Sequence, residues 1–304
     1  MRFTVAVVTH DRPSCVDRLL ERLRTQTLHP EEVIVVNNGP NDCTTAVVRE
    51  HDGSYNDAGI DLRLYERDDI NLPAGRNVAL EATTGDVICF LDDDTVPAES
   101  WLEGISWGYE RDDVSGVGGP SIAVDRTLTP RDELETDARN LNRLDRYGEV
   151  QDASRNWIPP YPVVTDLLQG SNMSFEKKTL ESIGGFDPGY HGYPLFEDTD
   201  VMAKYKKRGE TLVYHPDALV YHERVARDDS TQYWYWYWYA RNSIRFRRQN
   251  FSETYYRSLL RTFVRKRYYP PSVLEQIVVA LARRDQRSVT RLRGYVRGCT
   301  DELS

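Results

Sequence analysis

The first 120 residues of this 304-residue chain alternate short apolar runs with segments of helical periodicity. The strand-like runs, rich in β-branched residues, are Thr4–Val8, Glu32–Val36, Asp61–Glu66 and Asp86–Leu91. The segments with apolar residues at helical spacing are Cys15–Thr25, Thr44–Glu50 and Pro73–Thr83. Because parallel strands are joined by crossovers that are usually helices, this alternation predicts a mostly parallel α/β sheet flanked by helices.

The pattern is less regular after residue 120. We expect a strand at Asn172–Phe175, helices at Lys177–Ile183 and Glu197–Gly209, and short strands at Leu212–Tyr214 and Ala218–Tyr221. Periodicity fades between Pro120 and Pro162, where we expect only a helix near Glu133–Leu144. The chain is long enough for one large α/β domain with an appendage. We therefore expect a catalytic domain over residues 1–245, with halves at 1–120 and 121–245, and a basic helical region over 246–304.

Three consecutive carboxylates, Asp92, Asp93 and Asp94, follow the last apolar run of the first half. Adjacent carboxylates repel one another unless a cation or an open loop relieves them. In extended geometry Asp92 and Asp94 point the same way, and carboxylate oxygens are the ligands that hard divalent ions prefer. The triplet thus predicts a site for Mg²⁺ or Mn²⁺, and an acidic, solvated turn after a strand is the alternative.

The net charge of −9 conceals an asymmetry along the chain. Residues 241–304 contain 15 basic and 5 acidic residues, whereas residues 1–240 contain 24 basic and 43 acidic ones. Only 6 of the 39 basic residues are lysine. An acidic, lysine-poor body fits a halophile, although a GC-rich genome would also favour arginine.

No segment approaches the roughly 18 apolar residues that a membrane span needs, and the apolar start of the chain is too short for a signal peptide. We therefore expect a cytoplasmic protein. Four cysteines, Cys15, Cys43, Cys89 and Cys299, have no spacing typical of zinc or of a disulfide framework. We expect free thiols, two of them buried.

Seven consecutive aromatic residues occupy Tyr233–Tyr239, and an arginine-rich stretch follows them. Tyrosine and tryptophan favour wet apolar boundaries, and arginines beside them suit the headgroups of an anionic membrane. We expect peripheral membrane contact through residues 233–267. Alternatively, the aromatic residues pack under the catalytic domain and the arginines pair with its acidic body. The acidic body argues against a nucleic-acid partner.

Several polar motifs occur in a defined order. They are Thr9-His-Asp-Arg12, Asn37-Asn-Gly-Pro-Asn-Asp42, Asn71-Leu-Pro-Ala-Gly-Arg-Asn77, Asp92-Asp-Asp94, Gly184-Gly-Phe-Asp187, Phe196-Glu-Asp-Thr-Asp200, His222 and Tyr239-Ala-Arg-Asn242. This order resembles glycosyltransferase family 2, inverting enzymes with a GT-A fold, over about residues 3–245. The resemblance implies a Rossmann-like, mostly parallel central sheet and a helical C-terminal appendage.

The resemblance also implies a nucleotide-sugar donor held at the carboxyl ends of the strands. The residues placed near the donor are Thr9, Asp11, Arg12, Asn37, Arg76, Asn77, Asp92 and Asp93. Asp94, Asp92 and His222 are implied as metal ligands. Members of the family usually have Asp where this chain has Asn37, which weakens any inference about the base. Arg76 would brace Asp92 or a phosphate, or it would pair with acids for structure alone.

On the acceptor side, the family draws its general base from the Glu197-Asp198 pair, and we favour Asp198 with Glu197 in support. Acids at a helix start also complement the helix dipole, which is the structural alternative. His191 lies in an expected acceptor loop, and Arg241 is placed to neutralise a phosphate. Asp200 is expected to be a structural hydrogen-bonding partner.

The function that follows is transfer of a hexose or hexuronic acid from a nucleotide sugar to a lipid-phosphate-linked glycan. Such a glycan would be an intermediate of protein N-glycosylation, as on haloarchaeal surface layers, or of a surface polysaccharide, reached at the inner face of the membrane. A sugar nucleotidyltransferase is an alternative, but the glycine-rich loop typical of that class is missing at Thr9–Pro13. A non-catalytic sugar-nucleotide or glycan-binding protein is another, although a binder needs no positioned base.

Overall fold

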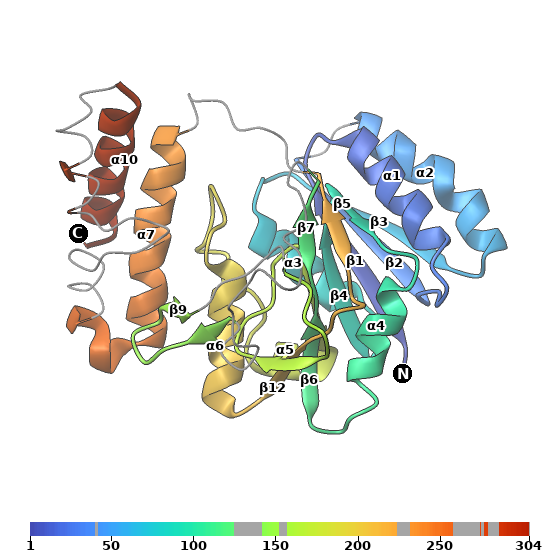
Figure 1. The fold of residues 1–304 in the computed structure, drawn as a ribbon. Coiled ribbons are helices and arrows are strands. Elements are labelled where there is room, and N and C mark those ends of the chain that lie inside the picture. The colour runs from blue at the N-terminus through green and yellow to red at the C-terminus, as the bar shows by residue number, and fades with distance from the viewer. Residues whose placement is uncertain are drawn as a thin grey trace.

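The computed structural model describes residues 1–39, 42–124, 142–151, 157–223, 232–257, 274, 277–278 and 286–303. At its centre lies an eight-stranded sheet in the order β10-β12-β6-β11-β4-β1-β2-β3 (Figure 1). Its strands are β1 (Phe3–Thr9), β2 (Glu32–Asn38), β3 (Asp61–Arg67), β4 (Val87–Asp92), β6 (Val114–Gly118), β10 (Val163–Thr165), β11 (Asn172–Glu176) and β12 (Thr211–Tyr214). Helices flank the sheet, so the predicted mixed α/β architecture is confirmed.

Strands β3, β2, β1 and β4 run parallel, as the alternating pattern predicts. Their crossovers contain α1 (Pro13–Arg24), α2 (Asp42–Asp57) and α3 (Leu72–Ala82), close to the expected helices. Register places Thr9 beside Asn37 and Val8 beside Asp92. The carboxyl ends of β1, β2 and β4 therefore meet at one edge of the sheet, where ligands of open α/β sheets bind.

Both expected halves contribute to this one sheet. β11 lies antiparallel between β4 and β6, and β12 pairs parallel with β6. The expected division at residue 120 thus falls between β6 and the short strand β7 (Ser121–Ala123). α5 (Lys177–Ser182) and α6 (Glu197–Arg208) follow in the second half, within one or two residues of their predicted bounds.

The sequence patterns missed several short elements. These are β5 (Thr95–Pro97), α4 (Trp101–Gly108), β6, β7, β9 (Val150–Gln151) and β10. β6 reads Val-Ser-Gly-Val-Gly, and its two glycines lie where a neighbouring strand leaves no room for a side chain: a Cβ on Gly116 would meet the Ser174 carbonyl oxygen at 2.9 Å. Of the expected helix near Glu133–Leu144, residues 133–141 lie outside the described residues. Its end was wrongly predicted, since Arg143–Leu144 form strand β8, paired with β9.

At the C-terminal end, α10 (Gln286–Leu303) packs along α7 (Gln232–Asn250), on the side of the molecule away from α1 and α2 (Figure 1). A 3₁₀ turn, η3 (Ser252–Thr254), follows α7, which itself spans the expected boundary at residue 245. Gly294 faces the Tyr233 carbonyl and Gly298 the Tyr237 carbonyl, so the two helices run in the same direction. Glycines four residues apart let two helix backbones approach closely.

Most of the described aromatic run is used in packing. Tyr235, Trp236 and Tyr239 are buried, whereas Trp234 is 54 % exposed. Tyr295 of α10 lies beside Trp236 and Tyr239. This geometry favours the packing alternative for these rings. Residues 258–267 of the expected membrane-contact segment lie outside the described residues.

Two further expectations concern thiols and membrane spans. All four cysteines are free, with Cys89 and Cys299 buried, as predicted. Within the described residues, no helix is both long enough and apolar enough to cross a membrane.

We predict that Gly298→Ala lowers the free energy of unfolding by about 1–3 kcal/mol, because the added methyl group overpacks the helix contact. The new Cβ would lie 2.1 Å from the Tyr237 carbonyl oxygen, a backbone atom that cannot rotate away. Urea titration of both proteins measures the change. Gly53→Ala in α2 is the matched control: its Cβ meets nothing within 4 Å, so it should stabilise by about 0.5–1 kcal/mol. Equal destabilisation by both variants would contradict the close helix contact.

Candidate active site

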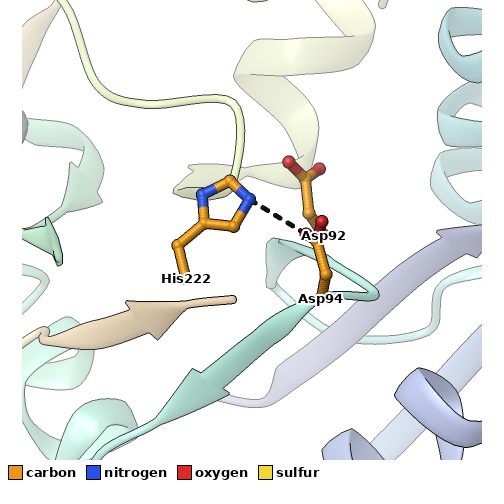
Figure 2. Close-up of side chains that lie close together, drawn as sticks. All are labelled: Asp92, Asp94 and His222. Atoms are coloured by element: carbon orange, nitrogen blue, oxygen red, sulfur yellow. Dashed lines mark ion pairs between the residues drawn. The ribbon is translucent and has the colours of Figure 1, made fainter. Parts of the chain in front are cut away.

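The acidic triplet lies in a tight turn between β4 and β5. Asp92 ends β4, and the Thr95 hydroxyl donates to the Asp92 carbonyl at 2.7 Å, which closes the turn. The extended geometry assumed from sequence is therefore wrong for Asp93 and Asp94. The turn nevertheless directs Asp92 and Asp94 into one space, where His222 joins them (Figure 2).

His222 lies about 130 residues after the triplet, and a second, three-stranded sheet places it beside these acids. In the order β5-β13-β7, β13 (Val220–His222) pairs antiparallel with β5, and His222 lies opposite Thr95. One carboxylate oxygen each of Asp92 and Asp94 and one ring nitrogen of His222 lie within 4.8 Å of one another. His222 Nε2 is 3.0 Å from Asp94 Oδ1.

This donor set fits a divalent cation. Two carboxylates and an imidazole suit Mg²⁺ or Mn²⁺, and three protein ligands leave coordination positions open for phosphate oxygens. Burial by itself raises the pKa of Asp94, but the hydrogen bond from His222 and the charges of His222 and Arg12 hold it below its usual value. Burial also raises the pKa of Asp92, which the charge of Arg76 opposes. Within the triplet, Asp94 is thus the carboxylate whose ionised form its surroundings favour.

Asp93 joins the triplet to the loop after β1. Thr9 Oγ1 donates to Asp93 Oδ2 at 2.7 Å, and Arg12 Nη1 donates to Asp93 Oδ1 at 2.9 Å and to Asp94 Oδ2 at 3.1 Å. Burial raises the pKa of Asp93 to about 6, although Arg12 and Thr9 oppose the shift. Asp11, between Thr9 and Arg12, is exposed and has a left-handed backbone, with φ of 51°.

Asn37 is brought to the same edge of the sheet but is fully buried. Its Nδ2 lies 3.5 Å from Thr45 Oγ1, which in turn donates to Glu66 at 2.6 Å. Asn37 therefore joins a polar group formed by β2, α2 and β3. Its amide at the carboxyl end of β2 stays a candidate for reading the base.

Arg76 is the buried centre of the site, with a side chain only 3 % exposed. Its guanidinium donates to Glu197 Oε1 at 2.7 Å and to the Gly170 carbonyl at 2.9 Å, and lies 3.4 Å from Asp92 Oδ1. The rings of Phe90 and Phe186 flank it. Of the readings left open from sequence, this burial favours bracing of Asp92 over direct contact with a phosphate.

Asn77 holds a different loop. Its Nδ2 donates to the Phe186 carbonyl at 2.7 Å, and its Oδ1 accepts from the Phe186 amide at 2.9 Å. Both ends of the side-chain amide are therefore used in fixing the Gly184–Asp187 turn. This geometry favours a structural role for Asn77 beside the donor site.

Asp198, at the start of α6, faces the site from the second half. Its Oδ2 accepts from the Gly170 amide at 3.0 Å, and its Oδ1 accepts from the Thr199 amide at 2.6 Å and hydroxyl at 3.0 Å. It is near enough for its charge to contribute to the raised pKa of Asp92. Half-buried Asp198 thus presents a carboxylate beside the metal-binding candidates, whereas Glu197 is buried against Arg76.

Comparison with known proteins decides the family. The family model described as glycosyl transferase family 2 matches residues 4–161, and glycosyl transferase family group 2 matches residues 87–283. The chain belongs to glycosyltransferase family 2. A Haloferax volcanii relative, glycosyltransferase AglE, is 30 % identical over an alignment of 229 positions that covers 69 % of this chain and 69 % of the relative. The family resemblance stated from sequence is confirmed.

Other similarities of this family 2 glycosyltransferase agree with that assignment. A glucosyl-dolichyl phosphate glucuronosyltransferase of Haloferax volcanii is 26 % identical and covers 73 % of this chain and 69 % of its own length. Among solved structures, a Pyrobaculum calidifontis mannosyltransferase in complex with GDP-Man and Mn²⁺ aligns with a TM-score of 0.61 at 19 % identity, over 99 % of this chain and 87 % of that one. The latter likeness shows a GT-A type fold.

The remaining predicted residues of the glycosyltransferase lie apart from the acidic cluster. His191 is exposed, and its ring lies 4.7 Å from the ring of Trp238. Arg241 lies over Trp238, and its Nη1 donates to the Gly189 carbonyl at 3.2 Å. Among the described residues, neither side chain makes a hydrogen bond, ion pair or ring contact with the three candidate metal ligands, so both belong to a separate surface that α7 helps to form.

Sequence reasoning missed Gly170, whose backbone holds two site residues at once. Its carbonyl accepts from Arg76 and its amide donates to Asp198. A Cβ on Gly170 would lie 2.9 Å from Asp198 Oδ2, so a glycine lets the loop approach the carboxylate. The only signal in the sequence is a glycine two residues before a strand, which also marks many ordinary loops. As expected, Asp200 is a structural hydrogen-bonding partner. Its buried carboxylate pairs with Lys204 and accepts a hydrogen bond from Asn250 Nδ2.

We predict that Glu197→Gln removes part of the pH dependence of stability. Burial and the charge of Asp198 raise the pKa of Glu197 from 4.5 to about 8, although Arg76 opposes the shift. Between these values the unfolded chain releases a proton that the folded protein keeps, so rising pH favours unfolding. From pH of about 4.5 to about 8, the Tm should fall less in the variant than in the unsubstituted protein.

This comparison is made in a chelating buffer, so that no bound cation changes the local charge. Glu103→Gln, at an exposed glutamate of α4, is the matched control and should keep the original pH dependence. An identical slope in all three proteins would show that the Glu197 carboxyl is ionised throughout this range.

Proposed function

We propose that this glycosyltransferase moves a hexose or hexuronic acid from a nucleotide sugar to a lipid-phosphate-linked glycan, with inversion and with the help of Mg²⁺ or Mn²⁺. The observation that carries the proposal is the convergence of Asp92, Asp94 and His222 within 4.8 Å, with Asp198 beside them. Two similar proteins support the substrate classes, since one is a glucosyl-dolichyl phosphate glucuronosyltransferase and the other is a mannosyltransferase in complex with GDP-Man and Mn²⁺.

Asp94, Asp92 and His222 would hold the cation, which when bound supplies positive charge for the diphosphate leaving group. Arg76 keeps Asp92 in place through a contact of 3.4 Å. Arg12 and Thr9 orient Asp93, which is thereby directed toward the ribose or sugar of the donor. Asp11 and Asn37 complete the nucleotide-binding half over residues 1–120.

Asp198 acts as the general base in this proposal. A carboxylate has about four lone-pair positions, and at Asp198 the hydrogen bonds from Gly170 and Thr199 use three of them. The proton of the acceptor hydroxyl passes to Asp198 as the hydroxyl oxygen bonds to the anomeric carbon of the donor. The bond from that carbon to the diphosphate breaks on the opposite face, and single displacement of this kind inverts the configuration.

Residues 121–245 would form the acceptor-binding half, with His191 and Arg241 on its outer part, and residues 246–304 would support it. We place the enzyme in the cytoplasm at the inner face of the membrane, because a lipid-linked acceptor is reached there. Peripheral contact would involve exposed Trp234 and the neighbouring arginines. The acidic, lysine-poor body supports operation at high salt.

Product analysis tests the proposal. The protein is incubated at high salt with Mn²⁺ or Mg²⁺, a membrane lipid extract and a panel of UDP- and GDP-linked hexoses and hexuronic acids. Release of nucleoside diphosphate from one donor, with sugar transferred to lipid, is the expected result. Pyrophosphate release would instead indicate a nucleotidyltransferase. Binding of a donor without any product across the panel would indicate a non-catalytic binding protein.

A further inference from the structure

A stripe of large side chains follows one face of α7. Trp238, Arg241, Arg245 and Arg248 recur at intervals of three and four residues, which places them on the same face of a helix. His191 and the Gly189 carbonyl contact the start of this stripe. Asp187 holds Arg245 with two hydrogen bonds to the same oxygen, at 3.1 and 2.8 Å.

The cationic end of the stripe borders a cavity. Arg245, Arg248, Gln249 and Glu302 line it, and its volume is about 290 Å³. This volume is roughly ten times the share of one water molecule in the liquid, so a phosphate group fits with its hydration. Gln249 is itself fixed, since its Nε2 donates to Asp187 and its Oε1 accepts from Tyr190. The cavity thus has ordered polar walls.

The fourth of the described lining residues, Glu302, is an anion contributed by α10. Its carboxylate lies 3.4 Å from Arg241 Nε, and its charge contributes to the raised pKa of Arg245. The Glu302 side chain is only 11 % exposed. A carboxylate and a phosphate present similar anionic oxygens to arginine, so α10 places a phosphate-like group against this surface.

We propose that the cavity at Arg245 and Arg248 is a subsite for a phosphate group of the acceptor, and that Glu302, which pairs with neighbouring Arg241, lines this cavity until the phosphate displaces it. The Glu302 carboxylate is 3.4 Å from Arg241 Nε, a long ion pair, whereas a phosphate brings greater charge and three acceptor oxygens. The inference rests on the proposed function only in assigning the phosphate to the acceptor.

The packing of α7 links this subsite to the general base. Phe196, directly before Glu197 and Asp198, packs against Tyr239 and Phe246 of α7. The Tyr190 hydroxyl joins Gln249 of the subsite to Asp200 of α6. Helix α7 therefore supports the segment that contains Asp198 and also carries Arg245 and Arg248. An acceptor long enough to reach both places would need its two binding regions joined in this way.

Calorimetric titration of the full chain with farnesyl phosphate tests the subsite without any donor. Arg248→Gln should weaken binding roughly tenfold, because it removes a charged hydrogen-bond donor. Glu302→Gln should strengthen binding roughly two- to fivefold, because it removes the competing anion. Arg49→Gln, at an exposed arginine of α2, makes the same charge change elsewhere and should leave affinity unchanged.

Two further ligands separate the sources of the phosphate. Much tighter binding of farnesyl phosphate than of inorganic phosphate assigns the subsite to a lipid-linked group, and equal affinities assign it to a free phosphate. Equal binding of uncharged farnesol would overturn the subsite. The subsite would also be overturned if Arg248→Gln and Glu302→Gln left the affinity for farnesyl phosphate unchanged. The same conclusion would follow if Arg49→Gln lowered this affinity as much as Arg248→Gln does.

This outcome is independent of the reaction. Arginine-dependent phosphate binding without any glycosyl transfer would leave the subsite standing and contradict the proposed function. Glycosyl transfer, together with farnesyl phosphate binding that Arg248→Gln and Glu302→Gln leave unchanged, would contradict the subsite alone.

Discussion

Replacing Asp94 with alanine should reduce the metal-stimulated release of nucleoside diphosphate by roughly 10²- to 10³-fold, the usual effect of losing one stabilising group for developing charge. Within the triplet, Asp94 is the carboxylate whose pKa is lowered, and it is 3.0 Å from the His222 ring. The variant loses a ligand of the proposed cation and leaves His222 without its acidic partner. Initial rates over a range of Mn²⁺ concentrations, with Mn²⁺ affinity from calorimetry, measure both effects.

The fold should survive this substitution, because Arg12 keeps its 2.9 Å contact with Asp93. Asp112→Ala, at an exposed aspartate in the turn after α4, is the matched control and should be as active as the unsubstituted enzyme. If Asp94→Ala keeps its rate and its response to Mn²⁺, the cation site is not at this turn.

The second large effect is expected for Asp198→Asn. Removing a general base lowers the rate by roughly 10²- to 10⁴-fold, and here it should do so while donor and Mn²⁺ affinities stay nearly unchanged. Single-turnover transfer of sugar, beside equilibrium binding of the donor, separates these two quantities.

Asparagine has one acceptor oxygen where aspartate has two, so it cannot accept from both the Gly170 amide, at 3.0 Å, and the Thr199 amide, at 2.6 Å, as Asp198 does. A local structural effect therefore has to be separated from chemistry. Thr199→Val provides this separation, because it removes the hydroxyl donor 3.0 Å from Asp198 and keeps the carboxylate. We expect Thr199→Val to retain most of the activity. A loss in Thr199→Val as large as that in Asp198→Asn would show that positioning, and not proton transfer, explains the result.

The parallel half of the fold was predictable because each of its elements has a local signal. β1, β2 and β4 are nearly continuous apolar runs since both faces of a parallel sheet are covered, and the crossover helices have one apolar face each. Strands of three residues, such as β5 and β7, carry too few residues for any period to be recognised. Pairing with β13, and not propensity, fixes their conformation.

The sequence indicated which acidic residues form the candidate site, but it did not indicate how these residues are arranged. The triplet indicated the candidate cation ligands, but Asp94 meets His222 only because of the β5–β13 register, which no local pattern shows. Gly170 was missed because its contribution comes from backbone atoms, which every residue has. The ion pair of Arg241 with Glu302 depends on how α10 docks on α7, a contact between segments about 60 residues apart.

The position of β11 in the sheet has a consequence for how the protein is made. β4 carries the first acid of the site and pairs with β1, but its other edge is completed only by β11, some 80 residues later. A growing chain that has reached residue 120 therefore has an open apolar strand edge, which promotes aggregation, and closing such a distant pair is slow. Folding of the site depends on synthesis as far as His222, so a fragment cut at residue 120 should be poorly soluble and unable to bind a cation.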